Sequence, residues 1–327
     1  MMKRLVLLIV LAALAWSGYW LWGRQTLVAS YDGWFAERRA EGWQAEYSDQ
    51  AVRGFPNRHD TTWTELRLLD SVSGYGWEAP FFQLFLLSYN RHHAITAWPR
   101  EQVLLTPDGP VSVTSDKMQA SLVTEGADHA LARGNLVADV LNITGSDGAT
   151  TAISQLRIAG TRVDEATYDL ALTAESLALP SAWLAATGGA LPETFSEARI
   201  AAQLAVDAPF ALGTSAEPQP TRLTVSEAAL EWGPMALRLS GDLKIDGKGR
   251  PTGEVEIQAT NWQEMLDVVR ASGQLPDGLA DGIEAALSLV SGLSGGRRTL
   301  DVTLRLEDDR LWLGPLPVGE APSLRFP

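Results

Sequence analysis

Residues 235–260 read MALRLSGDLKIDGKGRPTGEVEIQAT, and this stretch predicts the fold of the chain. Its first part alternates apolar and polar side chains, and the alternation returns after DGKG at residues 246–249. Period-two alternation is typical of a half-buried strand, and an Asp-Gly pair between two such runs favours a tight hairpin. We therefore predict two antiparallel strands that bury one face, with apolar positions Met235, Leu237, Leu239, Leu243, Ile245, Val255, Ile257 and Ala259.

The same alternation extends along most of the chain, with short amphipathic helices between the strands. Residues 32–42 and 261–273 have helical patterns, and Trp262, Met265, Leu266 and Val269 form one apolar stripe of the second. No βαβ rhythm appears, which disfavours a parallel sheet. We predict a mainly β fold with short helices, in which one or more elongated, strongly curved antiparallel sheets follow an N-terminal transmembrane helix.

The predicted division of the chain has an anchor at residues 1–24, a first β-rich half at 25–215 and a second at 221–327. The second half includes a helical hairpin at 261–291. The best candidate for a link is AEPQP, residues 216–220, because proline and polar residues disfavour a packed element there. A single continuous domain over 25–327 remains the alternative.

The N-terminus predicts a membrane anchor. Lys3 and Arg4 precede an uncharged apolar run, residues 5–22, which spans roughly 27 Å as a helix and so matches the hydrocarbon thickness. Its far end carries aromatic residues that favour a membrane interface: Trp16, Tyr19, Trp20 and Trp22. The basic pair stays cytoplasmic, so we expect a single-pass inner-membrane protein with its body in the periplasm. A signal peptide cleaved after Ala13-Leu14-Ala15 is the alternative, and it also exports the body.

Composition excludes several classes of protein. The chain has 26 Lys and Arg against 40 Asp and Glu, a formal net charge of -14, so phosphate backbones repel it and nucleic acid is not an expected partner. Cysteine is absent, which excludes disulfides and thiolate metal sites. Hydrophobic residues make up 46% of the chain, enough for a large packed core.

Two clusters could carry chemistry. In VRGFPNRHDTTWTELRLL, residues 52–69, His59 and Asp60 could act as an acid–base pair, but neighbours in a strand point to opposite faces. His92 and His93 are likewise adjacent rather than at the spacing of metal ligands. Nucleophile elbows, phosphate-binding loops and dinucleotide motifs do not occur. We predict no catalytic residue, metal or cofactor.

Aromatic residues are concentrated between the anchor and residue 100, which holds five of the 12 tryptophans. They could form the core of the first half, or the mouth of an apolar groove beside the membrane, because large exposed apolar patches mark binding surfaces. The predicted ligand-binding residues are Trp63, Trp77, Phe81, Phe82 and Phe85.

Several segments resemble a known family. Gly-Trp-Phe at 33–35, GFPNR at 54–58, GYGWEAPFFQ at 74–83 and LWLGPLP at 311–317 resemble the family called domain of unknown function 2125. Residues 241–276 are similar, more broadly, to the AsmA-like envelope proteins. The resemblance implies a membrane-anchored periplasmic protein with a curved β-sheet, and AsmA-like proteins are associated with outer-membrane assembly and lipid movement.

The first hypothesis from the sequence is therefore a non-enzymatic, membrane-anchored periplasmic protein that binds lipid or another apolar ligand in a sheet groove. A scaffolding protein that recruits envelope partners through its sheet edges is the alternative. A hydrolase that uses His59, Asp60 or the pair of His92 and His93 is the third hypothesis.

Overall fold

The structure is a computed structural model that describes residues 2–180, 192–212, 217–271, 284, 287–288 and 298–326. Strands make up most of it, and the registered strand pairs are antiparallel. This confirms the predicted mainly β fold behind an apolar N-terminal helix, whereas the predicted strong curvature stays a prediction. The chain divides into two compact units: residues 1–123 with 143–148, and residues 124–142 with 149–327.

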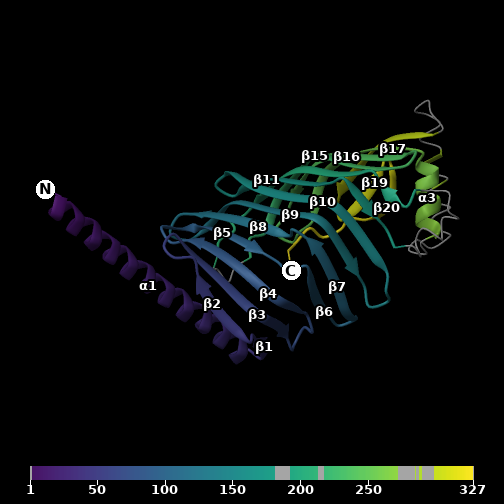
Figure 1. The fold of residues 1–327 in the computed structure, drawn as a ribbon. Helices are drawn as coiled ribbons and strands as arrows, with labels where there is room; N and C mark the ends of the chain where they lie inside the picture. The colour runs from purple at the N-terminus through teal and green to yellow at the C-terminus, as the bar shows by residue number, and fades with distance from the viewer. Residues whose placement is uncertain are drawn as a thin grey trace. The chain divides into compact units, whose positions relative to one another are not determined.

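The first unit consists of helix α1 and the strands that follow it. α1 is a single helix from Met2 to Ala40, and Figure 1 shows its N-terminal part extending beyond the strands. The anchor and the helix expected at 32–42 are thus one element, since residues 23–31 contain no proline and only one glycine. The strands are β1 Trp43–Glu46, β2 Asp49–Arg53, β3 Arg58–Asp70, β4 Gly76–Leu87, β5 Asn90–Ala97, β6 Glu101–Thr106, β7 Gly109–Asp116 and β8 Gln119–Glu125.

Strand β3 is the central strand beneath α1. One of its edges pairs with β1 and β2 in turn, and its other edge pairs with β4. β4 continues to β5 and β6, β6 pairs with β7, and β5 pairs with β8. The core of this unit lies between α1 and the strands and is formed by Phe35, Ala45, Trp63 and Leu66.

The second unit is a ladder of strands with one described helix of its own. In the series β10, β11, β14, β15, β16, β17, β18, β19, β20, each strand pairs with the one before it, and β10 also pairs with β9 and β12. The strands are β9 Ala130–Thr144, β10 Thr150–Asp164, β11 Thr167–Ala174, β12 Ser176–Ala178, β13 Thr194–Phe195, β14 Glu197–Val206, β15 Pro220–Trp232, β16 Met235–Ile245, β17 Pro251–Thr260, β18 Thr299–Glu307, β19 Arg310–Leu313 and β20 Leu316–Glu320. Helix α3, Trp262–Ala271, lies between β17 and β18 in the chain.

The hairpin predicted at residues 235–260 is present. β16 and β17 pair from Ala236 opposite Thr260 to Ile245 opposite Pro251, and the turn falls on the predicted DGKG. The side chain of Asp246 accepts hydrogen bonds from the backbone N–H groups of Lys248 and Arg250, at 2.9 and 3.0 Å. The first helix of the predicted helical hairpin is α3, and most of the second lies outside the described residues.

Candidate functional site

Helix α1 is fastened to two turns of its own unit by aromatic side chains. The side chains of residues 5–11 are 49–64% exposed, so this part of the helix contacts little protein. From Trp16 onward the helix meets the strands. The indole N–H of Trp16 donates to the carbonyl of Pro56 at 3.0 Å, and the hydroxyl of Tyr19 donates to the carbonyl of Ser88 at 2.9 Å. The indole N–H of Trp20 donates to the carbonyl of Arg58 at 2.8 Å.

His59 is the centre of this contact. It is only 1% exposed, and its ring stacks on that of Trp20 with centroids 5.1 Å apart and an interplanar angle of 11°. Its Nε2 lies 3.2 Å from the carbonyl oxygen of Trp20, so this nitrogen carries a hydrogen and donates. Burial lowers the pKa of His59, because the charged form would lose its hydration.

Gly23 permits the close approach of α1 to β3. A Cβ at this position would lie 3.2 Å from Cε1 of His59 and 3.1 Å from a guanidinium nitrogen of Arg91. Ordinary contacts between such atoms are about 3.5–4.0 Å, so a side chain would force the helix outward. The first of the two histidine clusters in the sequence is therefore part of a helix-docking surface.

The remaining members of the catalytic hypothesis lie elsewhere. Asp60 forms an ion pair with Arg58 at 2.8 Å, two residues along β3 and so on the opposite face from His59. His93 hydrogen-bonds Ser121 at 2.9 Å, and the backbone N–H of His92 donates to Asn90. Within the described part of the chain, no group of three or more His, Asp or Glu side chains could hold a metal ion.

Three of the five predicted ligand-binding residues meet in the core beneath α1. Trp63 is 5% exposed and packs edge-on against Tyr31 of the helix at 4.9 Å. Its other neighbour, Phe82, stacks on it at 6.1 Å and contacts Trp77 edge-on at 5.2 Å. The indole N–H of Trp77 donates to Gln102 at 2.8 Å. These rings fill the space between α1 and the strands.

The other two predicted residues lie outside that cluster. Phe81 is 36% exposed, and Phe85 is half-buried with the guanidinium of Arg58 5.8 Å from its ring centroid. A cation over a ring face at that distance is a favourable contact. The five residues are thus divided between a buried cluster and the surface, and ligand binding by them stays a prediction.

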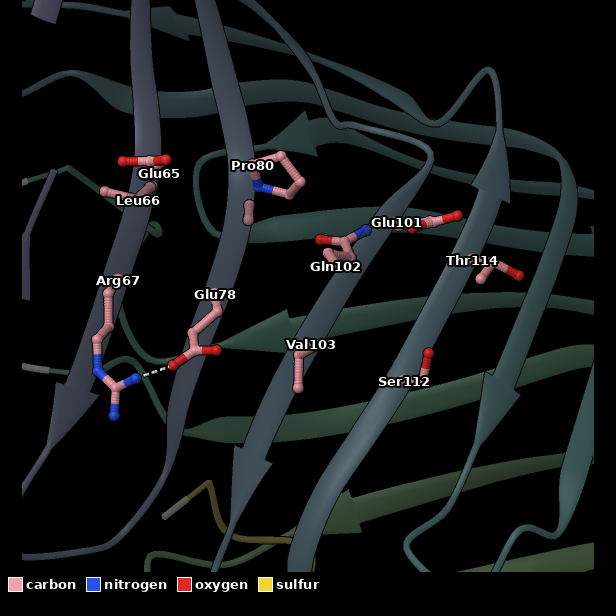
Figure 2. A pocket seen from close by; sticks show the side chains of 11 residues that line it. Glu65, Leu66, Arg67, Glu78, Pro80, Glu101, Gln102, Val103, Ser112 and Thr114 are labelled. Atoms are coloured by element: carbon pink, nitrogen blue, oxygen red, sulfur yellow. Dashed lines mark hydrogen bonds and ion pairs between the residues drawn. The ribbon is translucent and has the colours of Figure 1, made fainter. Parts of the chain in front are cut away.

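An open depression of about 670 Å³ lies on β3, β4, β6 and β7 (Figure 2). Figure 2 shows the ion pair between Arg67 and Glu78 at one end, with Glu65 and Glu101 among the other lining residues. Its lining mixes charged and polar side chains with the apolar Leu66, Ala79, Pro80 and Val103. Its shape and charge do not distinguish one polar ligand from another.

An apolar pocket of about 360 Å³ lies in the second unit, between α3 and strands β16 to β20. Trp262, the first residue of α3, is 3% exposed, and its ring N–H has no hydrogen-bond partner among the described residues. The lining is Leu237, Ile257, Ala259, Trp262, Met265, Leu266, Leu287, Leu300, Val302, Leu304, Leu313 and Val318.

Sequence reasoning identified the members of this pocket only as structural residues. The helical stripe of Trp262, Met265 and Leu266 and the alternation of β16, β17 and β18 were both visible as buried faces. Nothing in either pattern tells a filled core from a pocket, because both need the same apolar side chains. The one feature that could have indicated a pocket is Trp262, because it places a polar ring atom at the start of an otherwise apolar helical stripe.

The comparisons with known proteins show one family. No curated protein and no solved structure matched the chain. The wider likeness to AsmA-like proteins therefore stays a prediction. The match to a family described as an uncharacterized protein conserved in bacteria extends over residues 20–322, from the docked part of α1 to the end of the strand ladder. The chain therefore belongs to the DUF2125 family.

Proposed function

We propose that this protein is a non-enzymatic component of the bacterial envelope, held in the inner membrane by α1, which binds an acyl chain in the pocket of its second unit. The pocket carries the proposal. The residues that line it have apolar side chains, with Trp262 the one that also carries a polar atom, and its volume falls in the range of pockets that hold small ligands. An acyl chain gains about 0.8 kcal/mol for each CH₂ group removed from water.

The proposed ligand is an acyl chain with an acceptor group, which would have to reach the ring N–H of Trp262, an atom that is covered in the empty pocket. A buried N–H without a partner costs about 1–3 kcal/mol, and a carboxylate or ester oxygen would recover that cost. A pure hydrocarbon would leave it unpaired. The resemblance of residues 241–276 to AsmA-like proteins, which are associated with lipid movement, points to the same class of ligand.

Anchoring and orientation rest on α1. Among the described residues it is the one helix long and apolar enough to cross a membrane. Lys3 and Arg4 at its start favour the cytoplasmic side, which supports a periplasmic location for the strands. The proposal includes no catalysis, because His59 is buried beneath Trp20 and Asp60 is paired with Arg58 on the opposite face of β3.

The test compares two variants of one strand. Leu304 of β18 lines the pocket, whereas its neighbour Thr303 is exposed on the other face. Leu304→Glu should abolish binding of a fluorescent fatty acid to the purified full chain, and Thr303→Glu should leave it unchanged. Native mass spectrometry of the unmodified chain should show a co-purifying lipid. Absence of both lipid and fatty-acid binding would refute the proposal.

Strand addition is the second candidate function. β20 pairs with β19 along one edge, and no other strand pairs with β20 in the described part of the chain. An open edge offers backbone N–H and C=O groups to a partner strand. Crosslinking in intact cells from residues of β20 separates the two functions: a dominant protein adduct, with no bound lipid, would favour scaffolding.

A further inference from the structure

We infer that the turns at residues 54–57 and 88–90 enter the outer interface of the membrane and bind phospholipid there. The inference rests on the anchoring part of the proposed function and is independent of the pocket in the second unit. Both turns and α1 belong to the first unit, and the hydrogen bonds between them fix their relative depth.

The length of the apolar part of α1 sets the position of the membrane. Its uncharged segment, Leu5 to Gly23, lies between Arg4 and Arg24. At about 1.5 Å per residue this segment is about 29 Å long, close to the hydrocarbon thickness of about 30 Å. Arg24, whose guanidinium donates to the carbonyl of Val52 at 3.3 Å, therefore marks the outer boundary of the hydrocarbon.

The two turns are attached to α1 below that boundary. Trp16 precedes Arg24 by eight residues, which is about 12 Å along the helix, and Tyr19 precedes it by about 8 Å. These side chains donate to Pro56 and Ser88, and helical side chains lean toward the N-terminus. With Arg24 at the boundary, the turns would therefore lie about 8–12 Å below it, among the acyl chains, and an outward shift of α1 brings them toward the headgroups.

If α1 moves outward along the membrane normal, the turns still contact the membrane. If Trp16 itself marked the boundary, the segment from Leu5 would be only about 18 Å long, and the bilayer would have to thin by more than about 10 Å. Even then the Pro56 carbonyl, 3.0 Å from the Trp16 ring, would lie in the headgroup layer. A tilt of about 20° shortens these heights by only a few per cent.

The exposed side chains of the turns suit a membrane interface. Phe55 is 56% exposed and Tyr89 is 65% exposed, although both belong to tight turns where polar residues are usual. Aromatic rings of this kind favour the boundary between headgroups and acyl chains.

Backbone polar groups of the turns also have hydrogen-bond partners within the protein, as a medium poor in water requires. The carbonyl of Pro56 accepts from both Trp16 and the Ser88 hydroxyl, and the backbone N–H of Ser88 donates to the carbonyl of Asn57 at 2.9 Å. An unsatisfied carbonyl would cost several kcal/mol in hydrocarbon.

Basic residues surround the turns, in contrast with the rest of the chain. Arg24, Arg53, Arg58 and Arg91 lie on or beside them, and Arg91 reaches to Gly23 on the helix. Asp60, paired with Arg58, is the acidic group of this region. With a net charge of -14 for the whole chain, this local excess of arginine fits the phosphates of phospholipid headgroups.

The test uses the absence of cysteine from the chain. Phe55→Cys and Tyr89→Cys are labelled with an environment-sensitive fluorophore in the full chain, reconstituted in vesicles of phosphatidylethanolamine and phosphatidylglycerol. The matched control is Val72→Cys, 90% exposed in the turn at the far end of the β3–β4 hairpin, about 40 Å away. Leu8→Cys reports insertion of α1.

We expect lipids brominated near the headgroup to quench the labels at 55 and 89 at least several-fold more than the label at 72. Lipids brominated in the upper part of the acyl chain should quench the label at 8, which lies about 5 Å inside the inner boundary. If the label at 8 is quenched while those at 55 and 89 behave like the label at 72, the inference is overturned and the anchor stands. If the label at 8 is not quenched either, both the anchor and the inference fail.

Discussion

Replacing Gly23 with alanine should loosen α1 from β3, although alanine is the better helix former. The new Cβ would lie 3.2 Å from Cε1 of His59, a ring that is only 1% exposed and stacked on Trp20. The Arg91 guanidinium, at 3.1 Å, can swing aside because it ends a flexible side chain. The cost therefore arises mainly at His59.

The expected magnitude is the difference of two opposing effects. Overpacking of a well-fitted contact costs about 1–3 kcal/mol, and replacement of a helical glycine by alanine gains about 1 kcal/mol. Gly23→Ala should thus weaken docking by up to about 2 kcal/mol. Gly33→Ala is the matched control in the same helix, because nothing lies within 4 Å of its added Cβ and only the gain remains.

Amide hydrogen exchange in peptides covering residues 24–35 measures the effect where it occurs. With the full chain in detergent micelles, Gly23→Ala should speed exchange by a factor of about 5–30, the equivalent of 1–2 kcal/mol. Gly33→Ala should slow it. If both variants slow exchange equally, α1 does not depend on a tight contact with His59 and the docking argument is wrong.

Three further results are expected. Because burial lowers the pKa of His59, the unfolded state takes up a proton at a higher pH than the folded state does, and the free energy of unfolding should fall as the pH drops below about 6.5. His59→Gln should flatten that part of the curve when unfolding by denaturant is measured at a series of pH values. An unchanged curve would contradict the burial argument. Hydrogen bonds from Arg250 lower the pKa of Asp246 to about 2, so its carboxyl carbon should titrate there by NMR, and Arg250→Gln should move the midpoint toward 3.8; equal midpoints would refute the pairing. Trp262→Phe, which removes the ring N–H together with the five-membered ring that carries it, should weaken fatty-acid binding about tenfold in a fluorescence titration, whereas undiminished affinity would separate Trp262 from the ligand.

The strand ladder was predictable because its signal is local. In β16 and β17 each apolar residue is two positions from the next, and a slip of one residue would expose the whole buried face. The turn at 246–249 adds a second local signal, since Asp246 closes it with its own side chain. Such patterns need no knowledge of the rest of the chain.

The aromatic residues near the anchor gave an ambiguous prediction for the opposite reason. Trp63, Trp77 and Phe82 could equally line a groove or fill a core, and the difference depends on whether another element covers them. That element is α1, which precedes Trp63 by about 30 residues and whose sequence shows only an anchor and a short helix. The contact between Phe35 and Trp63, 6.4 Å between ring centroids, is not visible in any window of neighbouring residues.

The same limit explains why His59 looked like a candidate for catalysis. An interfacial aromatic residue and a docking aromatic residue need the same side chain, a ring with one polar atom at its edge. Trp20 satisfies both needs, because its N–H binds the Arg58 carbonyl while its face covers His59. Only the position of the groups that Trp20 contacts distinguishes a membrane-interface role from a docking role. Since those partners lie in the turns that Trp16 and Tyr19 also hold, the segment around residue 59 serves to fix the body at a defined height on its anchor. A helix that merely tethered the strands would not require Gly23, a buried neutral histidine and three carbonyls with aromatic donors at one point of contact.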